Sequence, residues 1–195
     1  MDTTNATTST AEQILALACE LVQTRGYNAF SYRDLAGQIG IKSASIHHHF
    51  PTKADLGKAM IRRYRENFAD ALEVIDRSRK SPSGRLSAYF DLFRQTARSD
   101  RGVCLGGMLA ADMLTLAPEV QAELRSFFAD SEEWLKGVLE AGAASGDFSL
   151  NGSPKDVALA IVSALEGAMM VARVHADPAR FDRATRYLLD SLTKS

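Results

Sequence analysis

The positions of proline constrain the fold of this chain more than any other feature of its sequence. Each of the five prolines stands where a run of apolar residues at helical intervals is about to begin, and none lies inside such a run: Pro51, Pro82, Pro118, Pro154 and Pro178. Proline is accepted in the first turn of a helix and disrupts a helix interior. No stretch alternates apolar and polar residues with β-branched enrichment, as a half-buried strand would. The sequence therefore predicts an all-α fold.

Composition narrows the class of protein. The 195 residues are 46% apolar and 24% charged, as in ordinary globular proteins, and no uninterrupted apolar run approaches the roughly 18 residues of a membrane helix. The opening MDTTNATTST lacks the basic and apolar regions of an export signal. We therefore expect a disordered tail over residues 1–9, a cytoplasmic location and no membrane partner. Cys19 and Cys104 lack metal-ligand spacing, so neither a metal nor another cofactor is expected.

Cap residues divide the N-terminal third into four helices. Three pairs have capping-box spacing: Thr10 with Gln13, Ser31 with Asp34, and Thr52 with Asp55. Gly26 and Gly40 supply stops after the first and second helices. A third short helix over residues 43–49 turns Ile46 inward and ends before Phe-Pro.

Five further helices are expected beyond residue 80, to make about nine in all. One covers residues 86–93, a shorter one follows a break at 100–102, and the last three begin at prolines. The penultimate helix, KDVALAIVSALEGAMMVARV, is apolar around most of its circumference and should be buried on nearly all sides. A monomer of this size can hardly cover it. We therefore expect the last two helices to pack against a second copy of the chain.

The tight turn Gly40-Ile41-Lys42 joins two short helices as a helix-turn-helix, a geometry that places the second helix in the DNA major groove. The outward residues of that helix are small or imidazole-bearing, so the backbone can approach base edges, and the lysines on either side can meet phosphates. Residues 1–66 hold eight Lys/Arg against six Asp/Glu, and residues 67–195 hold 15 against 18. The N-terminal part therefore suits a polyanionic partner.

The segment GYNAFSYRDLAGQIGIKSASIHHHFPTKADL, residues 26–56, resembles the DNA-binding segment of the TetR family of transcriptional repressors. It has the Gly-x-x-x-Phe start, the Asp-Leu-Ala helix, the Gly-Ile turn and the Phe-Pro-x-Lys-x-x-Leu end. Beyond about the first 60 residues only helix order and length match. The family usually has Leu-Tyr-x-His-Phe where this chain has Ile46-His47-His48-His49-Phe50, and its common Ser-Lys pair appears here as Lys42-Ser43.

The resemblance implies a DNA-binding domain with a linking helix over residues 10–66 and a ligand-binding and dimerisation domain over 67–195. Together with the outward face, it predicts ten DNA-contacting residues: Tyr32, Arg33, Lys42, Ser43, Ala44, Ser45, His47, His48, His49 and Lys53. Consecutive histidines point about 100° apart on a helix, so they cannot jointly hold one metal ion. No nearby carboxylate would orient an imidazole for acid-base catalysis. A merely solvated or packed helix end remains the alternative.

By the same resemblance, the fifth to seventh helices enclose an effector pocket. The candidates are apolar groups with a few polar ones: Phe93, Cys104, Met108, Asp112, Met113, Trp134, Glu166, Met169, Met170 and His175. Each could instead be an ordinary core residue. Cys104 lies near a helix start, which leaves two hypotheses open, a reactive sensor thiol and a buried inert one.

The function implied is a homodimeric repressor that binds a palindromic DNA operator and is released by an unknown small-molecule effector. A DNA-bound adaptor on the same scaffold, which responds to a protein partner, is the alternative. An enzyme is not expected, because the chain has no HExxH, GxSxG, Walker or Rossmann signature.

Overall fold

The computed structural model describes residues 9–192. Every regular element in that range is helical, which confirms the all-α fold and the nine predicted helices; two single-turn 3-10 helices add to them. The elements are α1 (Thr10–Arg25), η1 (Tyr27–Ala29), α2 (Tyr32–Ile39), α3 (Ser43–His49), α4 (Lys53–Ser78), α5 (Pro82–Arg98), α6 (Leu105–Ala111), η2 (Met113–Thr115), α7 (Pro118–Ser145), α8 (Pro154–Val174) and α9 (Pro178–Asp190). The tail predicted over residues 1–9 lies outside the described residues except for Ser9.

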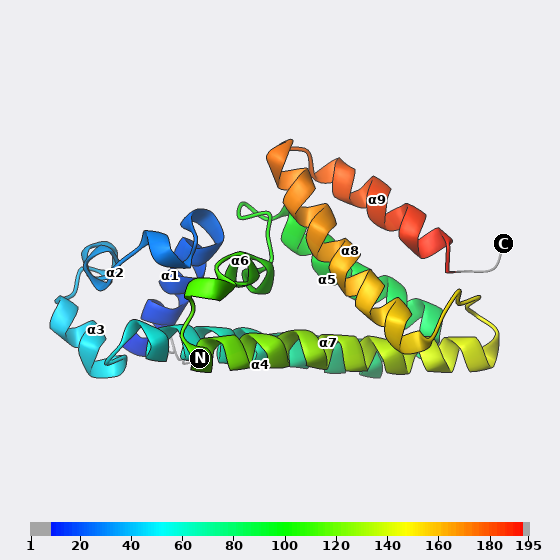
Figure 1. Ribbon diagram of the computed structural model, residues 1–195, viewed down its shortest axis with the longest axis horizontal. Helices are drawn as coiled ribbons and strands as arrows, with labels where there is room; N and C mark the ends of the chain where they lie inside the picture. The colour runs from blue at the N-terminus through cyan, green and yellow to red at the C-terminus, as the bar shows by residue number, and fades with distance from the viewer. Residues whose placement is uncertain (1–8, 193–195) are drawn as a thin grey trace, which may run out of the picture.

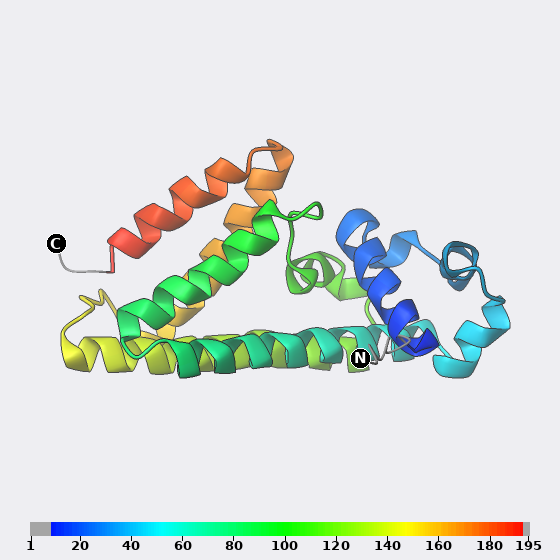
Figure 2. The ribbon, with the colours of Figure 1, turned by 180° about the vertical axis from the view of Figure 1, so that it is seen from behind.

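The helices form a small N-terminal group and a larger body that share one long helix. In both views α4 and α7 lie side by side along the molecule, with α1 to α3 at one end (Figure 1, Figure 2). The larger body also contains α5, α8 and α9, which pack against one another, and α5 and α8 pack on α7. Between the two groups lies α6, in contact with α1, α4 and α7. Movement of α6 or α4 would therefore reach the N-terminal group directly.

The predicted caps and stops are confirmed with one correction. Capping boxes form at Ser31 with Asp34 and at Thr52 with Asp55, and α1 and α2 end at glycines with positive φ. The first box, however, joins Ser9 to Glu12, because α1 already begins at Thr10 and the cap must precede it. Four of the five prolines are the first residues of α5, α7, α8 and α9, where the missing N–H costs nothing.

One continuous helix runs from the N-terminal group along the larger body. Leu56, Met60 and Ile61 near the start of α4 and Leu72 and Ile75 near its end are all buried, and they belong to one hydrophobic cluster. The helix has no break at position 66, so a tilt at one end moves the other end.

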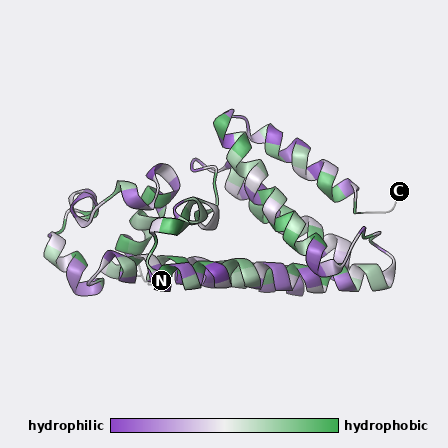
Figure 3. Ribbon diagram, in the orientation of Figure 1, coloured by the Kyte–Doolittle hydropathy of each residue, from purple (hydrophilic) through white to green (hydrophobic). Residues whose placement is uncertain are grey.

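α8 is buried on one face only. Among the described residues it is the one helix long and apolar enough to cross a membrane by length and composition, with a mean hydropathy of 1.8; core helices of water-soluble proteins meet the same criterion. It packs on α7 and α9. Apolar and small residues also follow its outer face, where Figure 3 shows green along much of the ribbon. Single-chain packing therefore does not produce the burial on nearly all sides that its sequence suggests.

Candidate DNA-binding surface and regulatory cavity

The turn between α2 and α3 depends on Gly40. This residue has φ 80° and ψ 28°, a left-handed conformation that side chains disfavour, and its N–H donates to the Ala36 carbonyl at 2.9 Å. Leu35 and Ile46 have no exposed area and hold the two helices together from inside. At the far end, the Phe50 N–H donates to the Ile46 carbonyl. α3 is thereby fixed with one face inward and one outward.

The outward side of α3 carries most of the predicted DNA-contacting residues. Exposed or half-buried side chains here define what we call the recognition surface: Arg33, Lys42, Ser43, Ala44, Ser45, His47, His48 and His49. The α3 residues and Lys42 are consecutive except for the buried Ile46, and no carboxylate interrupts them. Such a surface can approach a polyanion without like-charge repulsion.

Tyr32 does not belong to this surface, and its prediction as a phosphate contact is wrong. Its side chain is buried, and its hydroxyl donates to the carbonyls of Phe50, at 2.9 Å, and Thr52. Burial raises the pKa of the phenol. The signal was present in the sequence, because Tyr32 precedes Leu35 and Ala36 by three and four residues and so shares their buried face.

Lys53 is half-buried and already has protein partners, so its phosphate contact stays a prediction. Its Nζ donates to the Phe30 carbonyl at 2.6 Å and lies 4.3 Å and 4.8 Å from the ring centres of Phe30 and Tyr27. Desolvation lowers the pKa of this ammonium, against the charge of Asp112. Lys53 therefore joins the start of α4 to η1. Helical spacing does not predict this contact, because tertiary contacts set the direction of a long side chain.

The three histidines fall into two environments. His47 Nδ1 lies 3.2 Å from the Pro51 carbonyl oxygen, and its ring meets Tyr32 edge-on at 4.7 Å. The rings of His48 and His49 lie 5.5 Å apart on the exposed end of α3. Over residues 9–192, no group of three His, Cys, Asp or Glu side chains is arranged to hold a metal ion.

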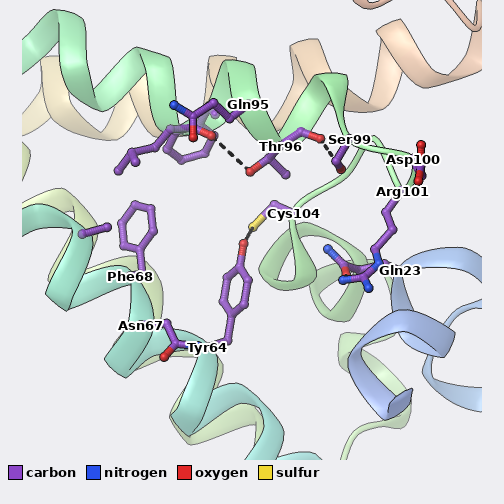
Figure 4. A pocket seen from close by; sticks show the side chains of 13 residues that line it. Gln23, Tyr64, Asn67, Phe68, Gln95, Thr96, Ser99, Asp100, Arg101 and Cys104 are labelled. Carbon is purple, nitrogen blue, oxygen red and sulfur yellow. Dashed lines mark hydrogen bonds between the residues drawn. The ribbon is translucent and has the colours of Figure 1, made fainter. Parts of the chain in front are cut away.

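A cavity of about 560 Å³ opens between α4, α5 and the loop that leads to α6 (Figure 4). Both α4 and α5 contribute apolar and polar lining residues, and the lining near the loop is mostly polar. The lining residues are Gln23, Tyr64, Asn67, Phe68, Ala71, Leu92, Phe93, Gln95, Thr96, Ser99, Asp100, Arg101 and Cys104. Tyr64 points across the cavity, and its hydroxyl donates to Cys104 Sγ at 3.4 Å.

Only two of the ten predicted pocket residues, Phe93 and Cys104, line this cavity. The other eight lie elsewhere: Met108, Asp112, Met113, Trp134, Glu166, Met169, Met170 and His175. Met169 is core, Met170 and His175 are exposed, and the Trp134 indole stacks on Tyr89 while its N–H donates to Asp76 at 2.9 Å. Residue type identified these candidates, but not the direction in which each side chain faces.

The lining residues of α4 were missed although their spacing was visible. Tyr64, Phe68 and Ala71 recur at intervals of four and three residues and so share one helix face. By contrast, Gln23 of α1 and Arg101 of the loop reach the cavity from positions 78 residues apart, where the Arg101 guanidinium donates to Gln23 Oε1 at 3.2 Å. No local pattern could have indicated that contact.

Two hydrogen bonds connect the region around α6 to the N-terminal helices. Gln23 Nε2 donates to the Val103 carbonyl at 2.8 Å, beside the cavity. At the other end of α6, the Tyr27 N–H donates to the Asp112 carboxylate, also at 2.8 Å. Asp112 thus links the end of α6 to η1.

A buried group of polar side chains lies behind the cavity wall. Burial raises the pKa of the Cys104 thiol despite its place at the start of α6, which supports the inert-thiol hypothesis. Burial also raises the pKa of Glu166 to about 7, with the Cys104 thiol acting in the opposite direction. Oε1 of Glu166 is the one buried side-chain oxygen or nitrogen in the described part of the chain without a hydrogen-bond partner.

The second helix of the helix-turn-helix is exposed, and one continuous helix joins this unit to a body that contains a cavity. This arrangement is that of a DNA-binding transcriptional regulator. Comparison with known proteins gives the family. Residues 14–60 match the model "Bacterial regulatory proteins, tetR family", and residues 82–188 match "Tetracyclin repressor-like, C-terminal domain". The chain belongs to the TetR family of transcriptional regulators, which bind DNA and typically dimerise.

Similar proteins span nearly the whole chain. A TetR-family transcriptional regulator from Agrobacterium tumefaciens is 34% identical, with a TM-score of 0.91 over 94% of this chain and 97% of that one. A TetR transcriptional regulator from Legionella pneumophila is 36% identical, with a TM-score of 0.87 over 96% and 100%. The HTH-type transcriptional repressor KstR2 of Rhodococcus jostii is 26% identical over 153 residues, which are 75% of this chain and 72% of that protein.

Proposed function

We propose that this protein is a homodimeric repressor that places α3 of each protomer in successive major grooves of a palindromic operator. The outward face of α3 carries the proposal, because its small residues and cationic neighbours are presented together on a rigid turn. Ser43, Ala44 and Ser45 read base edges, while Arg33 and Lys42 meet phosphates. The two α3 helices must lie about 34–36 Å apart. Such a repressor acts in the cytoplasm, in the same compartment as its operator.

The second copy of the chain covers the outer faces of α8 and α9. The outer face of α8 is uncharged over more than four turns and is formed by Leu159, Ala160, Ser163, Ala164, Gly167, Met170, Val171 and Val174. Arg173 lies at the border of this face and donates to the Thr24 carbonyl. Val174 is 82% exposed and Tyr187 of α9 is 81% exposed. Uncharged surface of this extent is typical of contacts between subunits. We accordingly assign residues 10–66 to DNA binding and 67–195 to effector binding and dimerisation.

Genomic-fragment selection with the purified protein at physiological salt tests DNA recognition, followed by fluorescence anisotropy on the enriched site. We expect an inverted repeat bound by one dimer. Lys42→Ala should weaken binding on all sequences and reduce the salt slope by about 1, whereas Ser45→Ala should change the preferred sequence. Fragments no more enriched than random DNA, or equal losses on specific and random DNA for both variants, would contradict the proposal.

The cavity between α4 and α5 is the proposed effector site. Its apolar wall suits an aromatic or aliphatic body, and the side-chain amides of Asn67 and Gln95 can bond a polar end. Arg101 is already bonded to Gln23 and lies 3.6 Å from Glu20, so an uncharged ligand fits better than an acid. A ligand would weaken operator binding if it bound more tightly to a conformation in which the hydrogen bond from Gln23 to the Val103 carbonyl is broken. The size of the effect is set by the difference between the ligand's affinities for the two conformations.

Filling the cavity should uncouple the protein from its effector. Ala71→Trp is expected to retain operator binding while losing release by any compound that raises the Tm of the wild type and dissociates it from DNA, because the indole occupies the ligand volume. Ser87→Trp, on the exposed side of α5, is the matched control and should respond as wild type does. If Ala71→Trp kept full release, the effector would bind elsewhere. If no small molecule acted on wild type, the protein-responsive adaptor would be favoured.

A further inference from the structure

The end of α3 carries two exposed imidazoles on the surface assigned to DNA. His48 and His49 form what we call the histidine pair, with Thr10, Ile41, Ala44 and Ser45 around an open hollow beside them. The two residues have different partners from His47, which lies within reach of the Pro51 carbonyl and against Tyr32. Histidine is the side chain whose charge ordinarily changes between pH 5 and 8. The histidine pair therefore places two exposed imidazole rings on the recognition surface, beside the permanently charged Arg33 and Lys42.

The groups around α3 leave the histidine pair without a counterion. The helices α1 and α2 pack on α3, and α4 follows it in the chain. The first turns of these three helices carry the following charged or titratable side chains: Glu12 of α1, Tyr32, Arg33 and Asp34 of α2, and Lys53 and Asp55 of α4. All three carboxylates are engaged in capping boxes, Tyr32 bonds two carbonyls, and Lys53 turns toward Phe30. Over residues 9–192 no ion pair joins a histidine to an acid. A DNA phosphate would be the first anion to meet these rings.

Contact with a phosphate favours a positive charge on these two rings. The histidine pair lies in the last turn of α3, at its exposed end. A neutral imidazole offers a phosphate at most one hydrogen bond, whereas an imidazolium adds a charge-assisted contact and releases a condensed counterion. Operator binding must then favour the protonated form of each ring, and by linkage protons must favour operator binding.

We propose that His48 and His49 bind operator phosphates as imidazolium groups. Operator binding then takes up protons, and the affinity for the operator increases as the pH falls from 8 to 6. The inference rests on the proposed placement of α3 on DNA. It makes the histidine pair a proton-dependent phosphate contact, distinct from the permanently charged Arg33 and Lys42. His48 stands at the variable position of the family's Leu-Tyr-x-His-Phe string and supplies the second ring, whereas His47 stands where the family usually has tyrosine.

The test is operator binding by the full-length dimer, measured by fluorescence anisotropy at pH 6, 7 and 8 and at several salt concentrations. Wild type should bind more tightly at pH 6 than at pH 8 by roughly fivefold per histidine, the size of one solvent-exposed charge contact. The salt slope should be steeper at pH 6 by up to about 0.9 per histidine. The double variant His48→Gln with His49→Gln should lose both effects and bind like wild type at pH 8.

Two control variants separate this site from other titrating groups. The chain has four histidines, and His175→Gln changes the one that lies outside α3, at the exposed end of α8. Glu166→Gln removes the buried acid that titrates in the same range. Both controls should keep the full pH dependence. Loss of it in Glu166→Gln, or wild-type binding that is tight and independent of pH, would overturn the histidine inference while leaving the repressor in place. Absence of specific binding at every pH would instead contradict the proposed function itself.

Discussion

Replacing Gly167 with arginine should convert the protein to a folded monomer and weaken operator binding by about 100-fold or more. Gly167 lies in the middle of the uncharged face of α8, and a Cβ at this position would meet nothing within 4 Å in the single chain. The substitution therefore spares the protomer, and arginine even favours a helix more than glycine does. In the dimer the same position would bury a charge without a partner.

The operator affinity falls because each separated protomer binds only one half-site. In a dimer, the first bound α3 holds the second at a high effective concentration over its half-site. Analytical ultracentrifugation would give the oligomeric state and anisotropy the operator affinity. Gly137→Arg is the matched control, since Gly137 is exposed on α7 and a Cβ there also meets nothing within 4 Å. A Gly167→Arg protein that stayed dimeric with wild-type affinity would refute the assignment of this face.

Glu166→Gln should stabilise the protein at pH 8 by about 3 kcal/mol and have little effect at pH 5. Burial raises the pKa of Glu166 from 4.5 to about 7 in the folded state. Because the folded pKa is the higher one, the stability contributed by the protonated acid is fully present below pH 4.5. It is lost as the pH rises through about 7. Glutamine cannot ionise and so avoids that loss.

The measurement is the free energy of unfolding by urea at pH 5, 7 and 8, at one fixed protein concentration because unfolding of a dimer is concentration-dependent. The free energies of unfolding of wild type and variant should diverge as the pH rises. Glu140→Gln, at an exposed position on α7, should follow wild type throughout. Equal stability of Glu166→Gln and wild type at pH 8 would mean that the carboxylate gains a partner in the dimer, and that it is not the uncompensated charge described above.

The fold was largely accessible from the sequence because its determinants are local. Proline at helix starts, glycine with positive φ at Gly26 and Gly40, and serine or threonine three residues before an acid each act within one helical turn. The same locality gave the exact bounds of α3, whose apolar residue Ile46 alone faces inward. The one misplaced cap, at Ser9 instead of Thr10, shows how two adjacent polar residues can compete for the same role.

Only part of the candidate sites could be predicted from the sequence. The recognition surface is a continuous stretch of chain, so eight of the ten predicted residues lie on it in the structure. Tyr32 and Lys53 do not, because each donates a hydrogen bond to a backbone carbonyl of another segment. The cavity is assembled from α1, α4, α5 and a loop, and composition alone identified only Phe93 and Cys104 among its lining residues.

The sequence by itself determined the helices, the turn that presents α3 and the family to which the chain belongs, since all of these follow from residues within a few positions of one another. The tertiary structure decided which polar groups remain available. It turned Lys53 inward, linked Asp112 to Tyr27, and left Glu166 buried without a partner for Oε1. The physical reason is that a side chain's hydrogen bonds and desolvation depend on segments far away in the chain, which pack beside it only after folding.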